Sequence, residues 1–354
     1  MSSKLGQLQQ FPFTVGPMVG LTHLAFRELI CDFFPNDFRP LLFTEMLSTL
    51  RLPSERFDVA EELRTTAVER GYLIPQILGN QGDFIRKSLT KLQLLEPWGI
   101  DINMGCPVKK TLRHNWGVKL MGDPRYAAEV VKTARDSFNG PLSVKLRCGL
   151  DKADDVFIAD FTAAIEEAGA DWISVHARLK ADKHKGKPNF ALVSRLKTKR
   201  KIPIFGNGGI QNLNDAKAVV EDHGLDGAMI GRAATARPWL LAQIAYDRGF
   251  AEFVNPLGET KAIPPQNLEE EGLLYLWSME RLCHHLDATC NSDQSRMKKF
   301  RFYITMSHRW LKFGNAFYRR CMKVKAWPEM SSMIKDYRQS LVSFPMLERI
   351  SLLQ

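Results

Sequence analysis

A cysteine ends a short apolar run in the segment DINMGCP, residues 101–107. The glycine before Cys106 marks the point where a strand gives way to a loop, so the thiol is expected at a strand end. A lone cysteine is more often an inert buried side chain. Four later apolar runs, however, also end in polar or Gly-rich tips: VKLRCG, VHAR, GNGGI and MIGRAA. A thiol and several polar tips that face one site indicate an enzyme rather than a scaffold.

The runs that hold these tips alternate with helical patterns along the chain. Strands are expected at 13–16, 41–44, 73–78, 100–104, 142–146, 172–176, 202–206 and 227–230. Helical periods lie at 24–34, 57–68 (a weaker one), 84–95, 125–138, 156–168, 190–199, 214–223 and 239–248. Eight strand–helix units before residue 250 predict an α/β fold of the TIM (β/α)8 barrel type. A doubly wound sheet is the alternative, but no GxGxxG motif follows the first strand.

The pattern divides the chain into a barrel and a helical tail. Residues 1–250 are predicted to form the barrel, and residues 251–267, which contain NPLGETKAIPPQN, a linker. Residues 268–354 show helical periods without a convincing strand and are expected to form an all-helical domain.

Composition narrows the class of protein. The six cysteines form no CxxC pair, which argues against a zinc site, an iron–sulfur site and a disulfide scaffold, so no metal is expected. No stretch approaches the roughly 20 apolar residues of a membrane span, and the first residues have no apolar core of a secretory signal. We therefore expect a cytoplasmic protein without a membrane partner, and a monomer.

Positive charge is concentrated in the tail. The net charge is +10, and residues 296–325 hold ten Lys and Arg with no Asp or Glu. The basic residues are Arg296, Lys298, Lys299, Arg301, Arg309, Lys312, Arg319, Arg320, Lys323 and Lys325, interleaved with aromatic residues. This pattern favours a surface that binds a polyanion such as a nucleic acid. The alternative is a solvated helix face over an aromatic core stripe.

In a parallel barrel the residues at the carboxyl ends of the strands surround the active site. The predicted mouth contains Met18, Glu45, Gln76, Asn103, Cys106, Lys145, His176, Arg178, Asn207 and Arg232. The tips after the seventh and eighth strands are rich in glycine, where barrels commonly bind phosphate. Gly208, Gly209 and Gly231 would admit the phosphate to the backbone and Arg232 would pair with it; otherwise these glycines only make tight turns.

Three polar side chains of the mouth have more than one interpretation. Lys145 could form a Schiff base, offer positive charge to an electron-rich ring, or extend to the rim. His176, beside Arg178 and the phosphate tips, is interpreted as a ligand contact rather than a structural histidine. Gln76 either hydrogen-bonds to the imide edge of a ligand or is a core amide whose hydrogen bonds are made within the protein.

The ordered motifs GPM, TEM, QILGN, DINMGCP, VKLRCG, VHAR, GNGGI and GRAATARPWL resemble those of the bacterial tRNA-dihydrouridine synthases. The resemblance covers about residues 13–240 and continues more loosely through SRMKKFRFYITMSHRWLK in the tail. It implies an FMN-binding TIM barrel, a helical tRNA-binding domain and NADPH-driven reduction of uridine to 5,6-dihydrouridine in the D-loop of tRNA. The tail resembles slightly more the C-type subgroup, which acts at position 16.

The resemblance also implies a role for each matching residue. FMN would be bound by Pro17, Met18, Gln76, Lys145, His176, Asn207, Gly208, Gly209, Gly231 and Arg232. Asn103 and Arg178 would contact the uracil, and Lys298, Arg301, Arg319 and Arg320 the tRNA. Hydride from the reduced flavin would go to C6 and a proton from Cys106 to C5; a thiol with a pKa near ~8.5 is protonated at neutral pH.

The sequence leaves the substrate subclass and two rival functions open. The loop 113–121, RHNWGVKLM, replaces the small, Gly-rich stretch of the family, so the substrate subclass is not set by it. The rival enzyme is another FMN barrel that acts on a free small molecule, similar to dihydroorotate dehydrogenase. A rival of another class is a non-catalytic RNA-binding relative that keeps the barrel.

Overall fold

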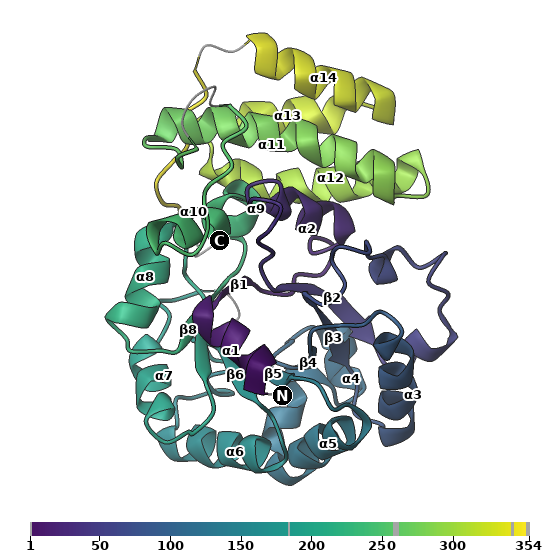
Figure 1. The fold of residues 1–354 in the computed structure, drawn as a ribbon, viewed down its shortest axis with the longest axis vertical. Helices are drawn as coiled ribbons and strands as arrows, with labels where there is room; N and C mark the ends of the chain where they lie inside the picture. The colour runs from purple at the N-terminus through teal and green to yellow at the C-terminus, as the bar shows by residue number, and fades with distance from the viewer. Residues whose placement is uncertain (1, 183–184, 258–261, 341–342, 352–354) are drawn as a thin grey trace.

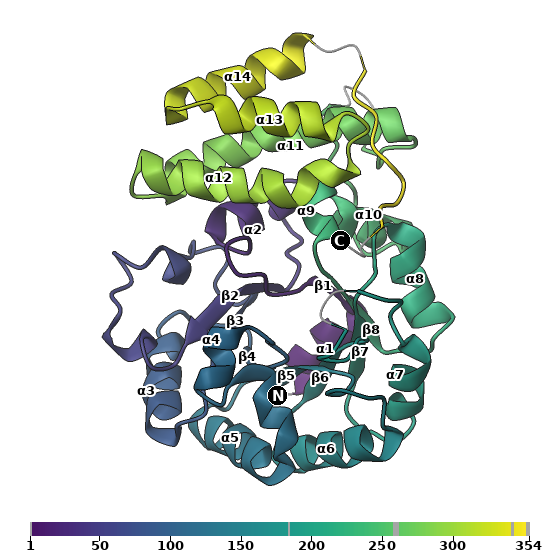
Figure 2. The ribbon, with the colours of Figure 1, turned by 180° about the vertical axis from the view of Figure 1, so that it is seen from behind.

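The computed structural model describes residues 2–182, 185–257, 262–340 and 343–351. Eight parallel strands close into a barrel in chain order, which confirms the predicted TIM barrel (Figures 1 and 2). The strands are β1 (Phe13–Val15), β2 (Leu42–Ser48), β3 (Leu73–Leu78), β4 (Ile100–Met104), β5 (Leu142–Arg147), β6 (Trp172–His176), β7 (Ile204–Asn207) and β8 (Gly227–Ile230). The register sets Asn103 opposite Lys145, and His176 opposite Asn207. Strand tips far apart in the sequence therefore lie at one level.

Helices surround the barrel because each apolar strand must be covered on its outer face. The barrel helices are α2 (Leu24–Cys31), α3 (Gly82–Gln93), α4 (Lys109–Arg113), α5 (Pro124–Ser137), α6 (Asp155–Glu167), α7 (Phe190–Lys197), α8 (Leu213–Glu221), α9 (Ala233–Ala236) and α10 (Leu240–Asp247). Several begin where the sequence supplies a capping side chain; Asp154, for example, accepts hydrogen bonds from Val156 N and Phe157 N.

The helix predicted at 57–68 is wrong. This segment contains turns and one short 3-10 helix, Glu61–Leu63, after another at Leu52–Ser54. Its polar side chains bond to the helical tail instead of forming an exposed helix face. The strand before it, β2, is also longer than predicted and contains an irregularity between Phe43 and Met46.

The amino-terminal end of the barrel is closed by a helix that the sequence patterns did not predict, α1 (Ser2–Gln10). Leu8 packs into a buried cluster with Phe43, Trp98 and Trp172. Trp98 Nε1 donates to Gln7 Oε1 at 2.9 Å. Figure 1 shows α1 lying across this end of the barrel. The cavity lined by the strand tips lies at the opposite end.

In the described part of the tail, four helices lie on one side of the barrel (Figure 2). They are α11 (Leu268–Thr289), α12 (Asp293–Ser307), α13 (Gly314–Lys323) and α14 (Trp327–Ser340), with a 3-10 turn at His308–Trp310. Helix α11 begins after Asn267, whose side chain accepts from two backbone N–H groups. Residues 258–261 of the predicted linker lie outside the described residues, as do 341–342 and 352–354 of the predicted helical domain. None of the helices in the described part of the chain is long and apolar enough to span a membrane.

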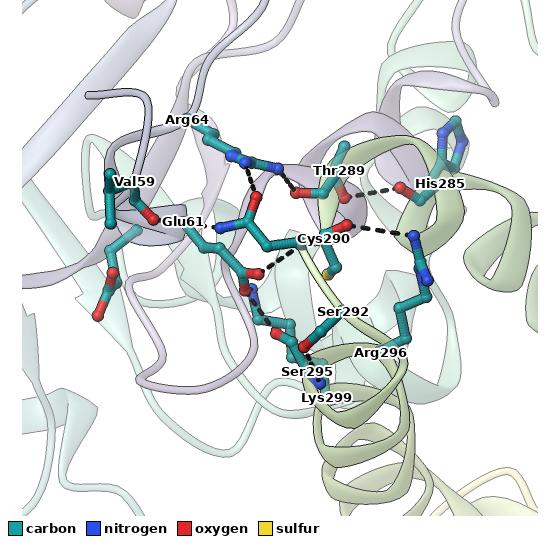
Figure 3. Close-up of polar contacts among 12 residues, drawn as sticks. Val59, Glu61, Arg64, His285, Thr289, Cys290, Ser292, Ser295, Arg296 and Lys299 are labelled. Carbon is teal, nitrogen blue, oxygen red and sulfur yellow. Dashed lines mark hydrogen bonds and ion pairs between the residues drawn. The ribbon is translucent and has the colours of Figure 1, made fainter. Parts of the chain in front are cut away.

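The helical tail packs firmly on the barrel. The ring of Phe33, just after α2, packs edge to face on Trp277 of α11. The ring of Phe26 in α2 packs in the same way on Tyr303 of α12. Asp32 accepts hydrogen bonds from Arg281 and, at 2.7 Å, from His285. The loop after β2 adds a polar contact (Figure 3).

The loop contact centres on Glu61 and Arg64. The Glu61 carboxylate accepts from Asn291 N at 2.8 Å, Ser295 Oγ at 2.6 Å and Lys299 Nζ at 2.7 Å. Partial burial alone would raise the pKa of Glu61, but these bonds and the Lys299 charge lower that pKa to about 2. Arg64 donates to Thr289 O and Asn291 Oδ1. The barrel and the turn between α11 and α12 are thereby joined.

After α14 the chain returns to the barrel. Leu347 N donates to Trp310 O at 2.6 Å, and Ile350 N donates to Gln211 Oε1 at 2.9 Å. Trp310 Nε1 donates to the same Gln211 oxygen at 3.2 Å. Since Gln211 follows the Gly-rich tip of β7, this returning segment ties the tail to that tip.

Candidate active site

One cavity of about 280 Å³ opens at the carboxyl end of the barrel. The structure brings to its wall the barrel residues predicted to bind the cofactor, contact the uracil or donate the proton: Pro17, Met18, Gln76, Asn103, Cys106, Lys145, His176, Arg178, Asn207, Gly208, Gly209, Gly231 and Arg232. Glu45 is the exception within the predicted mouth, because it faces a neighbouring cleft against α12. Arg147 and Trp310 also line the cavity but were not predicted there.

The cavity wall is strongly cationic. Lys145, Arg147, Arg178 and Arg232 line it, and the described lining residues include no Asp or Glu. Burial lowers the pKa of Arg178, and the charges of Arg232 and Arg147 lower it further. Burial and the charge of Arg309 lower the pKa of Arg232. Four cations that repel one another around a cavity are stabilised by a bound anion.

Lys145, from β5, lies among these cations and is half-buried at the strand tips. Burial lowers its pKa to about 8, although the charge of Asp101 opposes the shift. Its Nζ donates to Asn207 Oδ1 at 3.3 Å. Asn207 is oriented by its own Nδ2, which donates to Met229 O at 2.7 Å. The lysine is thus held at the strand tips instead of reaching the rim.

A chain of hydrogen bonds leads from the barrel interior to the thiol loop. Gln76 Nε2 donates to Asp101 Oδ2 at 2.6 Å, and Asn103 Nδ2 donates to Gln76 Oε1 at 2.8 Å. Asn103 Oδ1 then accepts from Cys106 N at 3.0 Å and from Gly105 N. Burial raises the pKa of Asp101 to about 7, against the hydrogen bonds from Gln76 and Ser143. The orientation of both amides is fixed by this chain.

The loop after Cys106 packs directly against it. The thiol lies 3.5 Å from Thr111 Oγ1 on α4, and Val118 N donates to Cys106 O. Gly117 has a φ of 60°, and a Cβ there would lie 2.6 Å from Cys106 O. The unusual Trp116 is buried, and its Nε1 donates to Asn80 Oδ1 at 2.9 Å. The loop thus holds Cys106 in position through contacts to its thiol and to its carbonyl group.

Beneath the thiol lies Arg147, which ends β5. Its Nε donates to Gly105 O at 3.0 Å and its Nη1 to Leu179 O at 2.9 Å. The VKLRCG motif contained this residue, but only the hydrogen bond to Gly105 O in the folded chain places it against the Cys106 turn.

The glycine tips form the opposite wall. Gly208 and Gly209 have φ values of 112° and 75°, which favour glycine, and a Cβ on Gly208 would meet His176 at 3.0 Å. A Cβ on Gly231 would meet nothing within 4 Å. His176 Nε2 lies 3.3 Å from Arg178 Nη1. The backbone at Gly231 is therefore open, whereas the side chains of His176 and Pro188 pack closely against Gly208 and Gly209.

The guanidinium of Arg178 already makes hydrogen bonds within the protein. Its Nε and Nη2 donate to the carbonyl of Gly186, and Nε also to that of Lys185. The guanidinium is held in place by the loop after β6, with Nη1 on the cavity side toward His176.

The predicted tRNA contacts of the tail lie in different environments. Lys298, Arg319 and Arg320 are exposed. Arg301 is half-buried and donates to the carbonyls of Met322 and Val324 at the end of α13, so its guanidinium is engaged within the tail. Of the interleaved aromatic residues, Phe300, Tyr303, Trp310 and Phe317 are buried, and Phe302 and Phe313 are exposed.

These residues fit a flavin mononucleotide. The glycine tips and Arg232 suit its phosphate, the half-buried Lys145 suits the electron-rich ring, and Pro17 and Met18 give an apolar wall. Among the described residues no group of three or more His, Cys, Asp or Glu could hold a metal ion. In parallel barrels of this kind the active site lies at the carboxyl end, and a phosphate site is frequently formed by the loops after the seventh and eighth strands.

The comparison with known families agrees. The family model described as "Dihydrouridine synthase (Dus)" matches residues 14–325. The chain is 30% identical to tRNA-dihydrouridine synthase B of Pseudomonas aeruginosa over 74% of this chain and 77% of that protein. It is also 30% identical to the probable tRNA-dihydrouridine synthase 1 of Synechocystis sp. over 65% of this chain, and spans 63% of that relative's length.

The chain belongs to the dihydrouridine synthase family, a class of flavin-dependent oxidoreductases that reduce uridine in tRNA. A probable tRNA-dihydrouridine synthase of Helicobacter pylori is similar as well, with 31% identity over 65% of this chain and 69% of that protein. Among solved structures, histamine dehydrogenase from Rhizobium sp. 4-9 gives a TM-score of 0.49 at 10% identity over 67% of this chain and 46% of that chain. A likeness that low adds nothing about function.

Proposed function

We propose that this chain reduces a uridine in the D-loop of tRNA to 5,6-dihydrouridine with bound FMN and NADPH as the reductant. The observation that supports it best is the cationic, carboxylate-free cavity with Cys106 on its wall. Membership of the dihydrouridine synthase family gives the reaction class. Residues of the cavity can be assigned to each part of that reaction.

The FMN phosphate would be held by the backbone of Gly208, Gly209 and Gly231 together with Arg232. Asn207 supports this side of the cavity and also orients Lys145. Bound FMN supplies hydride chemistry that side chains cannot. Pro17, Met18, Gln76, Lys145 and His176 would surround its ring, and the lysine places positive charge against an electron-rich heterocycle.

The uracil would lie between the flavin side and the thiol. Asn103 has one amide hydrogen left beyond its bond to Gln76, and Arg178 presents Nη1 on the cavity side. Cys106 would donate its thiol proton to C5, because a protonated donor on the opposite face completes reduction of the C5–C6 double bond. The base must leave the tRNA stack to reach this depth.

The tRNA would bind over the exposed basic residues of the tail, including Lys298, Arg319 and Arg320, with the chain acting as a monomer in the cytoplasm. The target uridine would be the one at position 16 of the D-loop, the position on which the C-type subgroup acts.

Two experiments test the proposal. Protein purified with bound yellow FMN that NADPH reduces and unmodified tRNA reoxidises is the expected result, and dihydrouridine should be missing from one D-loop position in tRNA of a deletion strain. Reoxidation by dihydroorotate-type small molecules, with no effect of tRNA, would instead establish the small-molecule rival. Protein without flavin that still binds tRNA would establish the non-catalytic rival.

A further inference from the structure

The helical tail supplies one residue to the wall of the catalytic cavity. Among the described residues that line this cavity, Trp310 alone comes from the tail. It ends the 3-10 turn His308–Trp310, and only 2% of its surface is exposed. Burial lowers the pKa of Arg232 at the β8 tip, and the charge of Arg309, the residue before Trp310, lowers it further. Trp310 therefore lies on the side of the cavity where the cofactor phosphate would be bound.

A barrel side chain beside the glycine tip of β7 holds this ring. Trp310 Nε1 donates to Gln211 Oε1 at 3.2 Å, and both side chains are buried. Gln211 directly follows Ile210, which ends the GNGGI tip and is part of the cavity wall. The backbone N–H of Gln211 donates to Asp215 Oδ2 at 2.8 Å, which fixes it against the start of α8. The position of the tryptophan is thus set by the same tip that would bind the phosphate.

The amide group of Gln211 also holds the returning segment 343–351. Its Oε1 accepts from Ile350 N at 2.9 Å, and its Nε2 donates to Ile350 O at 3.0 Å. Leu347 N of this segment donates to Trp310 O at 2.6 Å. In Figure 2 the segment runs from the helical tail down to the barrel. Trp310 and the returning segment therefore dock on the barrel together, through one side chain.

A second anchor follows the glycine tip of β8. Arg237 directly follows α9, the short helix that begins after Arg232, and only 1% of its surface is exposed. Its Nη2 donates to Leu347 O at 2.9 Å and to Glu271 Oε2 at 2.6 Å. Separating a buried ion pair leaves uncompensated charge, so this anchor opposes undocking of the tail. Each tip that would bind the phosphate is thus followed in the sequence by a side chain that bonds to the tail.

Closing this side of the cavity strengthens the binding of an anion. An indole ring in the wall takes the place of water beside Arg232 and the glycine tips. The attraction between a guanidinium group and a phosphate is larger where water is excluded, because the local dielectric constant is lower. A cofactor that binds tightly only when the tail is docked must in turn stabilise the docked tail.

We propose that Trp310 is a cofactor-binding residue supplied by the helical tail, and that Gln211 is the positioning residue that holds it. Loss of flavin and undocking of residues 343–351 are then coupled. This inference rests on the proposed function, which places FMN in the cavity. It adds the tail to a site that the sequence motifs assign to the barrel alone.

The test compares Trp310 with a second tail tryptophan that packs on the barrel. Trp277 lies edge to face on Phe33 and does not line the catalytic cavity, so Trp277→Ala is the matched control for Trp310→Ala. Trp310→Phe keeps an aromatic wall without the Nε1 donor, and Gln211→Leu removes the amide group at similar size. For each purified holoenzyme, thermal unfolding reports stability. The rise of flavin fluorescence after dilution gives the release rate and the dissociation constant of FMN.

A second readout follows the returning segment directly. Hydrogen exchange of the peptide that contains Leu347 and Ile350 is measured by mass spectrometry with and without saturating FMN. FMN should slow this exchange in the wild type, because both backbone N–H groups bond to the Trp310–Gln211 pair. The slowing should be lost in Gln211→Leu. A side chain that only stabilised the fold would not make this exchange depend on FMN.

The four variants should differ in their affinity for FMN. Trp310→Ala should bind FMN on the order of tenfold more weakly, because truncating a buried aromatic contact typically costs a factor of that size. Trp310→Phe should lose less, and Gln211→Leu an intermediate amount. Trp277→Ala should lower the thermal stability but change the affinity for FMN by less than about twofold, since effects at separate sites are nearly independent.

Wild-type affinity for FMN in both Trp310→Ala and Gln211→Leu would overturn the inference. Equal losses in Trp310→Ala and Trp277→Ala would also overturn it, because docking of the tail as a whole would then be responsible. If Trp310→Ala does not fold, unchanged affinity in both Trp310→Phe and Gln211→Leu, with FMN-dependent exchange as in the wild type, overturns it instead. Failure of the proposed function looks different: the wild type would hold its flavin and NADPH would reduce it, but tRNA would not reoxidise it.

Discussion

Replacing Asp101 with asparagine tests the buried hydrogen-bond chain beneath the thiol. Asp101 is fully buried on β4, and burial raises its pKa from 3.8 to about 7. Between these values the folded protein binds a proton that the unfolded chain has released. The free energy of unfolding must therefore fall as the pH rises through this window. Asparagine cannot titrate, so Asp101→Asn should remove this part of the pH dependence.

The size of the effect follows from the two pKa values. From pH 5 to the folded-state value near 7, a difference of 1.36 kcal/mol per pH unit gives about 3 kcal/mol. At pH 5 the variant should be the less stable protein, because Ser143 Oγ and Gln76 Nε2 both donate to the natural carboxyl group. By pH 8 the wild type should have lost about 3 kcal/mol of stability relative to the variant, because it then buries a charge. The stability difference between the two proteins should therefore shrink or reverse.

Urea unfolding followed by tryptophan fluorescence at pH 5, 6, 7 and 8 measures this difference. Asp136→Asn is the matched control, because Asp136 is an exposed carboxylate that pairs with Lys132, and its curves should stay parallel to the wild type. Catalytic turnover of Asp101→Asn should stay within a few-fold, because the asparagine oxygen can still accept from Gln76. Parallel stability curves for Asp101→Asn and wild type would refute the argument and mean that water or Lys145 keeps the carboxylate charged.

Four further predictions concern the site and its supports. Cys106→Ala should keep FMN and tRNA binding but slow flavin reoxidation by tRNA by about 10²–10⁴-fold; turnover within a few-fold of wild type would make Cys106 a packing residue. Arg232→Ala should purify with less FMN at nearly unchanged tRNA affinity, and full occupancy measured by absorbance would show that the β8 tip does not hold the phosphate. Gly117→Ala should destabilise the protein by about 1–3 kcal/mol in thermal unfolding and lower kcat, because its φ is 60° and its Cβ would press on Cys106 O; unchanged kcat would mean that the thiol is not held from this side. Glu61→Gln should weaken the barrel–tail contact and remove stability that the wild type has above the ordinary pKa of glutamate and loses as the pH falls toward about 2; an unchanged acid-unfolding profile would contradict this.

The barrel and the composition of its mouth could be predicted from the sequence. Strand length and the helical period of the segments between strands are local properties, and parallel strands in a barrel all end at one edge. Cys106, Lys145, His176 and Arg232 therefore meet in one cavity although more than a hundred residues separate the first from the last.

Only the tertiary structure decided which charges of the tail are available to a ligand. Arg301 and Arg319 belong to the same basic segment, yet the guanidinium of Arg301 is bonded to the carbonyls of Met322 and Val324, whereas Arg319 is exposed on α13. The segment 57–68 fails as a helix for a related reason, since Glu61 accepts from Asn291, 230 residues away. A local pattern shows which face of an element is buried. The partner of each polar side chain depends on contacts between distant segments, and these exist only in the folded chain.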